Sequence, residues 1–336
     1  MHSEEVVLAL CDGEEEYTQL ITEYMEKWER LPWVVHAYTD VEKLMEAEKG
    51  VDLLVVSESD YRDEIKTLSP KRLIVLNESG IVRNKNLRYV NKYQQADQLV
   101  REILCIYLEI ATQVLPRLGL EGKTTFIGFF SPVRRAMQTT FSLTMSQLLS
   151  KKHKTLYLNF EYFPAHQEIL ADQQTRDLAD LLYFLNAEKD KFALRLQSMV
   201  RQVGSLDYVP PMKSGQNLLG ITAKEWIDFM QKLQELGEYE YVLMDLSESM
   251  QGLFDVLRTC QRVYTVTLED RAASGKLTQY EKLLTQYAYE DVLEKTQKCA
   301  LPKIRRLPAQ LEYYDRGELA DYVMEQLADI APDEFE

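Results

Sequence analysis

Apolar and polar residues alternate along the first 112 residues in blocks of strand and helix length. The apolar runs, which predict five strands, lie at residues 5–11, 33–37, 51–56, 72–76 and 88–90. The amphipathic stretches, which predict helices, lie at residues 14–30, 41–48 and 95–112. Strands that alternate with helices favour a parallel sheet covered on both faces. We therefore expect a flavodoxin-like α/β domain.

A break in this pattern separates the first half of the chain from the second. Residues 115–123 contain Pro116, Gly119 and Gly122, which interrupt the preceding helical pattern. We interpret this stretch as a linker between a first domain at residues 1–114 and a second domain at residues 124–336.

The second half repeats the alternation of strands and helices. Its apolar runs, which predict strands, lie at residues 124–130, 155–160, 206–209, 241–246 and 263–268. Its helical patterns lie at residues 137–150, 176–185, 224–236, 253–259, 272–287 and 317–327. This order predicts a second doubly wound domain with a mainly parallel sheet.

Composition and charge narrow the classes of function. The net charge is −15 and no long basic stripe is present, which argues against direct binding to nucleic acid. The longest apolar runs are only as long as strands, so we expect no membrane insertion. The four cysteines are scattered and form no metal-binding motif, which is typical of reduced thiols in a cytoplasmic protein.

The first half resembles the receiver domain of response regulators in the order and length of its elements. A receiver carries two acids after its first strand, a phospho-accepting aspartate at the end of the third and a lysine after the fifth. At these places this chain has Asp12 alone, Ser57 and Lys92. Without the carboxylate nucleophile no acyl phosphate can form, which predicts a pseudo-receiver. The alternative is a flavodoxin-like domain of another function, in which Asp12 and Lys92 form a structural ion pair.

The segment after the run at 124–130 occupies the place of a phosphate-binding loop. Such a loop needs glycines, because its backbone N–H groups must curl around the phosphates, and a lysine to neutralise them. Residues 130–140, FSPVRRAMQTT, resemble the deviant Walker A loop of the MinD/ParA ATPases, with the rough pattern S-P/G-K-G-G-V-G-K-T-T.

Aligned on that pattern, the loop has lost both lysines. Val133 replaces the signature lysine and Gln138 replaces the P-loop lysine, while Arg134, Arg135 and Met137 replace glycines. These three side chains disfavour the left-handed backbone that glycine adopts freely. Arg134, Arg135 and Gln138 are then the side chains left in the loop to contact a nucleotide.

Other parts of the family's site have counterparts at the family's spacing. Thr139 and Thr140 match its hydroxyls, and Glu161 replaces an aspartate after the second strand. Asp245 ends a run that resembles the Walker B strand, and Pro302 lies in a Leu-Pro turn similar to the one beside the purine. The resemblance implies ATP as ligand, with Mg²⁺ at Thr139 and Asp245. The alternative is a doubly wound domain that binds no nucleotide.

A pseudo-receiver followed by a MinD/ParA-type domain is similar to the CpaE/TadZ group of pilus-assembly proteins. This resemblance implies a cytoplasmic homodimer that partners recruit to the cell pole or membrane, where it helps to assemble a Tad-type pilus or secretion machine. Loss of the lysines predicts little or no ATP hydrolysis. Two alternatives are an active ATPase, with arginine supplying the missing charge, and a MinD-like regulator of cell division, which the acidic C-terminus disfavours.

Overall fold

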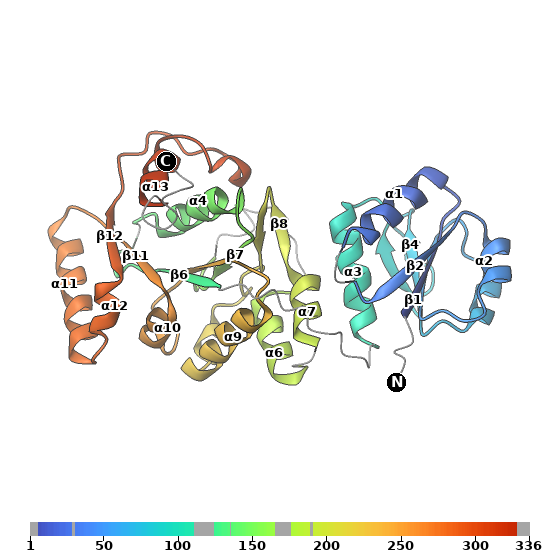
Figure 1. Cartoon of the computed structure of the whole chain (residues 1–336), viewed down its shortest axis with the longest axis horizontal. Coiled ribbons are helices and arrows are strands. Elements are labelled where there is room, and N and C mark those ends of the chain that lie inside the picture. The colour runs from blue at the N-terminus through green and yellow to red at the C-terminus, as the bar shows by residue number, and fades with distance from the viewer. Residues whose placement is uncertain are drawn as a thin grey trace. The chain divides into compact units, whose positions relative to one another are not determined.

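The chain folds as two compact units (Figure 1), and the computed structural model describes residues 6–28, 31–110, 124–134, 136–164, 176–188 and 191–327. The first unit comprises residues 1–115 and 190–198, and the second comprises residues 116–189 and 199–336. The division after residue 115 falls within the expected linker at 115–123, a stretch that lies outside the described residues. The segment at 190–198 joins the first unit from a distant part of the sequence, which the apolar pattern did not indicate.

The first unit is built on a five-stranded parallel sheet. Its strands are β1 (Val6–Cys11), β2 (Trp33–Tyr38), β3 (Leu53–Ser57), β4 (Arg72–Asn77) and β5 (Arg88–Asn91). They lie in the order β2-β1-β3-β4-β5, which is the doubly wound order of flavodoxin-like domains. Every residue of β3 is buried, as expected for a central parallel strand.

Helices cover both faces of this sheet. Helices α1 (Glu15–Glu26) and α3 (Ala96–Leu108) pack on one face, and α2 (Val41–Ala47) and the 3₁₀ helix η1 (Asp63–Leu68) pack on the other. Residues 78–87, between β4 and β5, contain no helix. Leu194 of α7 (Phe192–Met199), a helix that the sequence did not predict, joins the core under α3.

The second unit contains a seven-stranded sheet. Its strands are β6 (Thr125–Phe129), β7 (Thr155–Asn159), β8 (Arg201–Val203), β9 (Leu206–Tyr208), β10 (Tyr241–Asp245), β11 (Arg262–Thr267) and β12 (Thr296–Ala300). They lie in the order β12-β11-β6-β10-β7-β9-β8, and β8 runs antiparallel to β9 while the other pairs are parallel. The expected α/β class with a mainly parallel sheet is confirmed.

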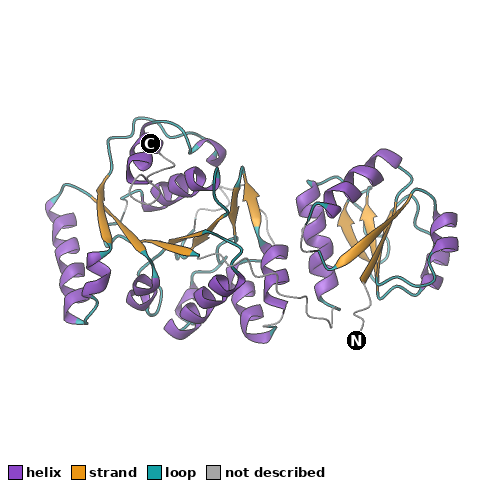
Figure 2. Cartoon of the chain, in the orientation of Figure 1, coloured by secondary structure: helices purple, strands orange, loops and turns teal. Residues whose placement is uncertain are grey.

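The helices of the second unit also lie on both faces of its sheet (Figures 1 and 2). Helix α4 (Gln138–Ser150) packs against α13 (Glu318–Leu327) over one face, and all residues from Phe141 to Ser150 are buried. The other helices in the described part of this unit are α6 (Leu178–Ala187), α8 (Gln216–Leu219), α9 (Ala223–Leu236), α10 (Leu253–Thr259), α11 (Arg271–Gln286), α12 (Glu290–Glu294) and the 3₁₀ helix η3 (Leu311–Tyr313).

The strand register brings the segments of the candidate site together. Strand β10 lies between β6 and β7, and Asp245 at its end is level with Phe129 of β6 and Asn159 of β7. The loop after β6 and the end of β10 therefore meet at the carboxyl edge of the sheet, where ligands of doubly wound domains bind.

Two expectations from the composition can be compared with this fold. Among the described residues, no helix is both long and apolar enough to cross a membrane. The four cysteines form no disulfide, and Cys11, Cys260 and Cys299 are buried. Burial raises the pKa of the Cys11 and Cys260 thiols to about 12, so both are unreactive at neutral pH.

Candidate functional site

The loop between β6 and α4 is shaped by hydrogen bonds of Ser131 at its start and by the backbone conformation of Met137 at its end. Ser131 Oγ donates to Val266 O (2.5 Å) and accepts from the Val133 N–H (3.1 Å), which fixes the start of the loop. Met137, immediately before α4, has φ 61° and ψ 30°. This left-handed conformation costs a residue with a side chain about 1–2 kcal/mol, so Met137 occupies a position suited to glycine. Arg134 does not adopt a left-handed conformation.

Gln138, which stands where the family has its P-loop lysine, is fixed by hydrogen bonds to the sheet edge. Its Nε2 donates to Asp245 Oδ1 (2.6 Å), to Leu246 O (2.9 Å) and to Phe129 O (3.2 Å). An amide nitrogen has two hydrogens, and three protein oxygens surround this one. The side-chain amide of Gln138 therefore has no hydrogen left for a phosphate.

Asp245 is fully buried and both of its oxygens accept hydrogen bonds. Oδ1 accepts from Gln138, and Oδ2 accepts from the hydroxyl of Tyr157 (3.1 Å). Burial, together with the negative charge of Glu161, raises the pKa of Asp245 to about 7. To bind Mg²⁺, whose ligands are ionised oxygens, this carboxyl group would have to release its proton and the donors that enclose it.

A cavity of about 450 Å³ lies above these residues, between the loop, the end of β7 and the end of β10. Its charged lining residues in the described part of the chain are Arg134, Glu161 and Glu248. Arg134 Nε donates to Glu248 Oε1 (3.0 Å), so this cation is already neutralised. Glu161 then leaves the lining with a net negative charge, which repels a phosphate group.

The expected nucleotide contacts do not all reach this cavity. Arg134, Gln138, Thr139 and Glu161 line it, and Asp245 lies beneath Gln138. Thr140 and Pro302 are not among its lining residues, and Arg135 lies outside the described residues. No group of three or more histidine, cysteine or acidic side chains in the described residues is arranged to hold a metal ion.

Two residues that form hydrogen bonds in this site, Tyr157 and Glu248, were not identified from the sequence. In the sequence, Tyr157 is one residue of an apolar run that predicts a buried strand. Its hydrogen bond to Asp245 depends on the pairing of β7 with β10. Glu248 lies three residues after Asp245 in a polar loop, where an acidic residue gives no distinctive signal. Both contacts join segments that are far apart in the sequence.

The first unit contains a separate cluster of charges at the carboxyl edge of its own sheet. The ammonium group of Lys92 lies 2.8 Å from Asp12 Oδ2, 2.9 Å from Glu14 Oε1 and 3.0 Å from Glu78 Oε1. It also lies 4.9 Å from the ring centre of Tyr17. Burial alone would lower the pKa of Lys92, but the three carboxylates raise it above its ordinary value. Lys92 is thus a permanently charged, enclosed cation.

Ser57, at the place of a receiver's phospho-acceptor, is hydrogen-bonded to Asp60 and is also connected to the Lys92 cluster, through Ser59 (3.1 Å) and Glu78 (3.3 Å from Ser59). Its hydroxyl donates to Asp60 Oδ2 (2.6 Å) and accepts from the Asp60 N–H (3.1 Å). The same carboxylate oxygen accepts from the Gly13 N–H (2.6 Å). Asp60, Glu14 and Glu78 were not identified from the sequence, since the expected pattern places no acid at those positions.

Comparisons with known proteins find similarity only at the level of the fold. No protein-family model matches the sequence, and no curated protein is similar to it. A ParA-family ATPase from Chlorobium tepidum is 16% identical, with a TM-score of 0.46 over 63% of this chain and 94% of that one. MinD from Aquifex aeolicus is 13% identical, with a TM-score of 0.47 over 62% and 98%.

A third similar structure is MinD from Pyrococcus horikoshii, which was determined as a complex with Mg-ADP. It is 13% identical, with a TM-score of 0.47 over 63% of this chain and 96% of that one. These structural neighbours are therefore MinD- and ParA-type ATPases. With such identities and TM-scores, the similarity assigns no activity to this chain.

Proposed function

We propose that this chain is an atypical MinD/ParA-type protein that acts as an assembly scaffold and no longer hydrolyses nucleotide. The observation that carries this proposal is the position of Gln138. Where the family has a lysine, the amide of Gln138 donates into Asp245 and two backbone carbonyls. The residue that should neutralise phosphate instead holds the loop to the end of β10.

The size of the expected catalytic loss supports this proposal. Phosphoryl transfer depends on positioned N–H groups, lysine and Mg²⁺, and loss of one preorganised donor typically costs on the order of 100- to 1,000-fold in rate. Both lysines of the family pattern are replaced here, by Val133 and Gln138. Arg134 is paired with Glu248 and does not replace them.

We propose in addition that the first unit is a pseudo-receiver that transmits no phosphoryl signal. Ser57 supplies a hydroxyl where a carboxylate would be required, and Lys92 is enclosed by three carboxylates. Incubation with a small-molecule phosphodonor should give no increase in intact mass. An acid-labile phosphoryl adduct within residues 1–112 would contradict this part of the proposal.

Steady-state phosphate release by the purified protein tests the loss of hydrolysis. We expect no release above the level of an Asp245→Ala control, which reports contaminating activity. A variant that carries Val133→Lys, Met137→Gly and Gln138→Lys restores both lysines and one glycine. Gain of ATP binding in this variant, measured by calorimetry, would show that the substitutions in the loop cause the loss.

The second candidate function is an active ATPase, which the left-handed conformation of Met137 and the position of Thr139 at the cavity favour. In that case Arg134 would have to leave Glu248 to meet the phosphates. Glu248→Gln would free the guanidinium group and raise turnover. Turnover that is present in the natural chain and absent from Asp245→Ala would establish this function instead.

The cellular role proposed for the scaffold is the assembly or positioning of a Tad-type pilus or secretion machine, with a homodimer recruited through protein partners. This proposal rests on the domain order and on the loop substitutions. Neighbouring genes for pilins, a secretion ATPase or an inner-membrane platform would support it. Neighbouring genes for division-site selection would favour the cell-division alternative.

A further inference from the structure

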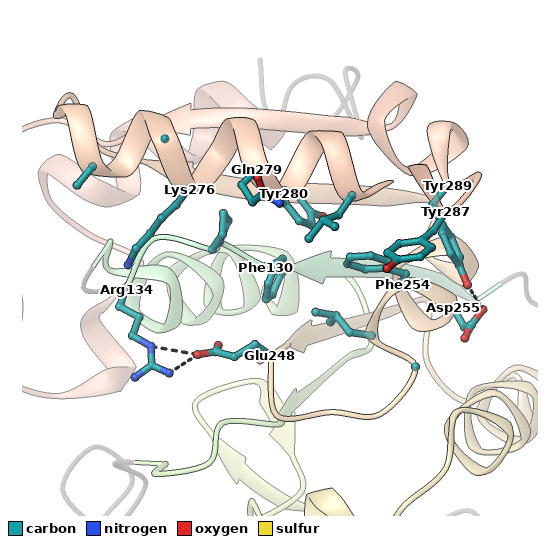
Figure 3. A pocket seen from close by; sticks show the side chains of 16 residues that line it. Phe130, Arg134, Glu248, Phe254, Asp255, Lys276, Gln279, Tyr280, Tyr287 and Tyr289 are labelled. Atoms are coloured by element: carbon teal, nitrogen blue, oxygen red, sulfur yellow. Dashed lines mark hydrogen bonds and ion pairs between the residues drawn. The ribbon is translucent and has the colours of Figure 1, made fainter. Parts of the chain in front are cut away.

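A groove of about 1160 Å³ lies beside helix α11 in the second unit (Figure 3), and it shares only Arg134 and Glu248 with the loop cavity. Ala272, Gly275, Gln279 and Leu283, on one side of α11, form a wall of the groove. The loop after β6, the start of α10 and its preceding loop, and the segment after α11 form the rest. The wall from Ala272 to Leu283 is roughly 16 Å long at about 1.5 Å per helical residue.

Aromatic rings line the groove and support one another. The ring centres of Phe130 and Tyr280 are 5.2 Å apart, those of Phe254 and Tyr280 are 6.1 Å apart, and those of Phe254 and Tyr289 are 5.4 Å apart. The hydroxyl of Tyr289 donates to Asp255 Oδ1 (2.6 Å), which fixes that ring. Such ring pairs are mutually stabilising, so the apolar surface is formed before anything binds to it.

Gly275 lies in the middle of the wall, within a 16-residue helix. Glycine weakens a helix interior relative to alanine. A Cβ added at this position would meet no other atom of the described chain within 4 Å. Packing within the chain therefore does not require glycine here, and the open space leaves room for a group from outside to approach the backbone of α11.

The two ends of the groove differ in charge. Figure 3 shows Arg134, Glu248 and Lys276 at one end and Phe254, Tyr287 and Tyr289 toward the other. Arg134 is hydrogen-bonded to Glu248, and, against the effect of burial, the charge of Lys276 also lowers the pKa of that carboxyl group, so two cations share one carboxylate. That end consequently carries an excess positive charge, which an acidic side chain would neutralise.

The dimensions favour a peptide over a small molecule. Pockets for small ligands usually enclose about 300–1,000 Å³, and this groove exceeds that range and extends along a helix. An apolar groove of this length suits an amphipathic helix, whose apolar residues recur at intervals of three and four on one face. The open position at Gly275 would allow the two helices to approach closely.

We propose that this groove binds an amphipathic helix of a partner protein, with apolar side chains on the aromatic surface and an acidic residue beside Lys276. The proposal rests on the scaffold function, since it names the class of partner that the scaffold recruits. It does not depend on the side chain of Gln138, which does not line the groove, and loss of one proposal is measured separately from loss of the other.

The probe is a phage-displayed library of peptides as long as α11, 16 residues, selected on the full-length protein. We expect binders with apolar residues at helical spacing and an acidic residue near one end. Gly275→Leu, which fills the groove, should weaken the selected peptides by roughly tenfold or more. Lys276→Glu, a surface change that leaves the groove open, should weaken them by about fivefold or more.

Thr278→Leu is the matched control, because Thr278 is exposed on the same helix but does not line the groove. This variant should bind the peptides as the natural chain does, and circular dichroism should show that all three variants are folded. Binders that are indifferent to both groove variants, or no binders at all, would overturn the proposal. A dimer that dissociates on Gly275→Leu would assign the groove to a second copy and would also overturn it.

Phosphate release measured on the same variants separates this proposal from the scaffold function. ATP turnover in the natural chain would refute the loss of hydrolysis while leaving peptide binding intact. Failure of peptide binding without turnover would refute the groove proposal alone.

Discussion

Asp245 is a buried carboxyl group with a pKa raised to about 7, chiefly by burial and then by the charge of Glu161. In the unfolded chain it titrates near 3.8. Between these values the folded protein keeps a proton that the unfolded chain releases. The stabilisation is therefore complete at low pH and is lost as pH rises through about 7.

The second unit should consequently lose about 2 to 3 kcal/mol of its free energy of unfolding between pH 5 and pH 8 through this group. Asp245→Asn should remove that part of the pH dependence, because the amide does not titrate. Urea unfolding at both pH values measures the effect. Asp321→Asn, at an exposed site on α13, should keep the natural slope. An unchanged slope in Asp245→Asn would contradict the assignment.

Met137 is a single residue whose backbone conformation opposes its side chain. At φ 61° it occupies the left-handed region immediately before α4. Met137→Gly should raise the free energy of unfolding of the second unit by about 1 kcal/mol, because glycine adopts this conformation without a steric penalty. Met137→Ala keeps the Cβ and should give no gain. Chemical unfolding measures the free energy of unfolding of the two variants. Equal changes in both would show that the Met137 side chain, and not its backbone conformation, causes the change.

At the scale of elements, two glycines that line the groove should respond in opposite ways to alanine. Gly252, before α10, has φ 71°, and a Cβ there would lie 2.2 Å from Ala223 Cβ at the start of α9. Gly252→Ala should therefore cost at least about 2 kcal/mol of stability. Gly275→Ala should instead add about 0.5–1 kcal/mol, because it lies within a helix and meets no neighbour.

Thermal or chemical unfolding of these two variants provides an internal comparison, since the chemical change is the same. A gain at Gly252 would mean that α9 and α10 adjust more easily than their contact implies. A loss at Gly275 would mean that the groove wall is packed against something other than solvent.

Some elements could be predicted from their own sequences and others could not. Strand β3 is a continuous apolar run, and its burial on both faces followed from that pattern. Strand β12, with the sequence TQKCA, was missed because only one of its residues is buried at the edge of the sheet. An edge strand takes its conformation from its neighbour β11, and its own sequence carries little apolar period.

At the scale of the whole molecule, nucleotide should not control assembly. If the chain is of the MinD/ParA type, as proposed above, a dimer would pair across the phosphate-binding loop, but Gln138 and Asp245 already satisfy each other there. Sedimentation velocity should give the same oligomeric state with and without ATP·Mg²⁺. Chains that associate only after ATP is added would show that the loop still senses nucleotide, and Gln138→Lys provides a variant in which such a response could return.

The sequence by itself determined most of the order of the elements, the α/β class of both units and the identity of the missing chemical groups. The spacing of apolar residues is a local property of the sequence, so it predicts which residues of a strand or helix are buried. Substitutions such as Ser57 for a carboxylate and Gln138 for a lysine are likewise visible in the sequence alone. Only the tertiary structure decided which groups meet. Gln138 and Asp245 are 107 residues apart, and they touch because β6 and β10 are neighbours in register. The groove beside α11 arises in the same way, from segments that no local pattern connects.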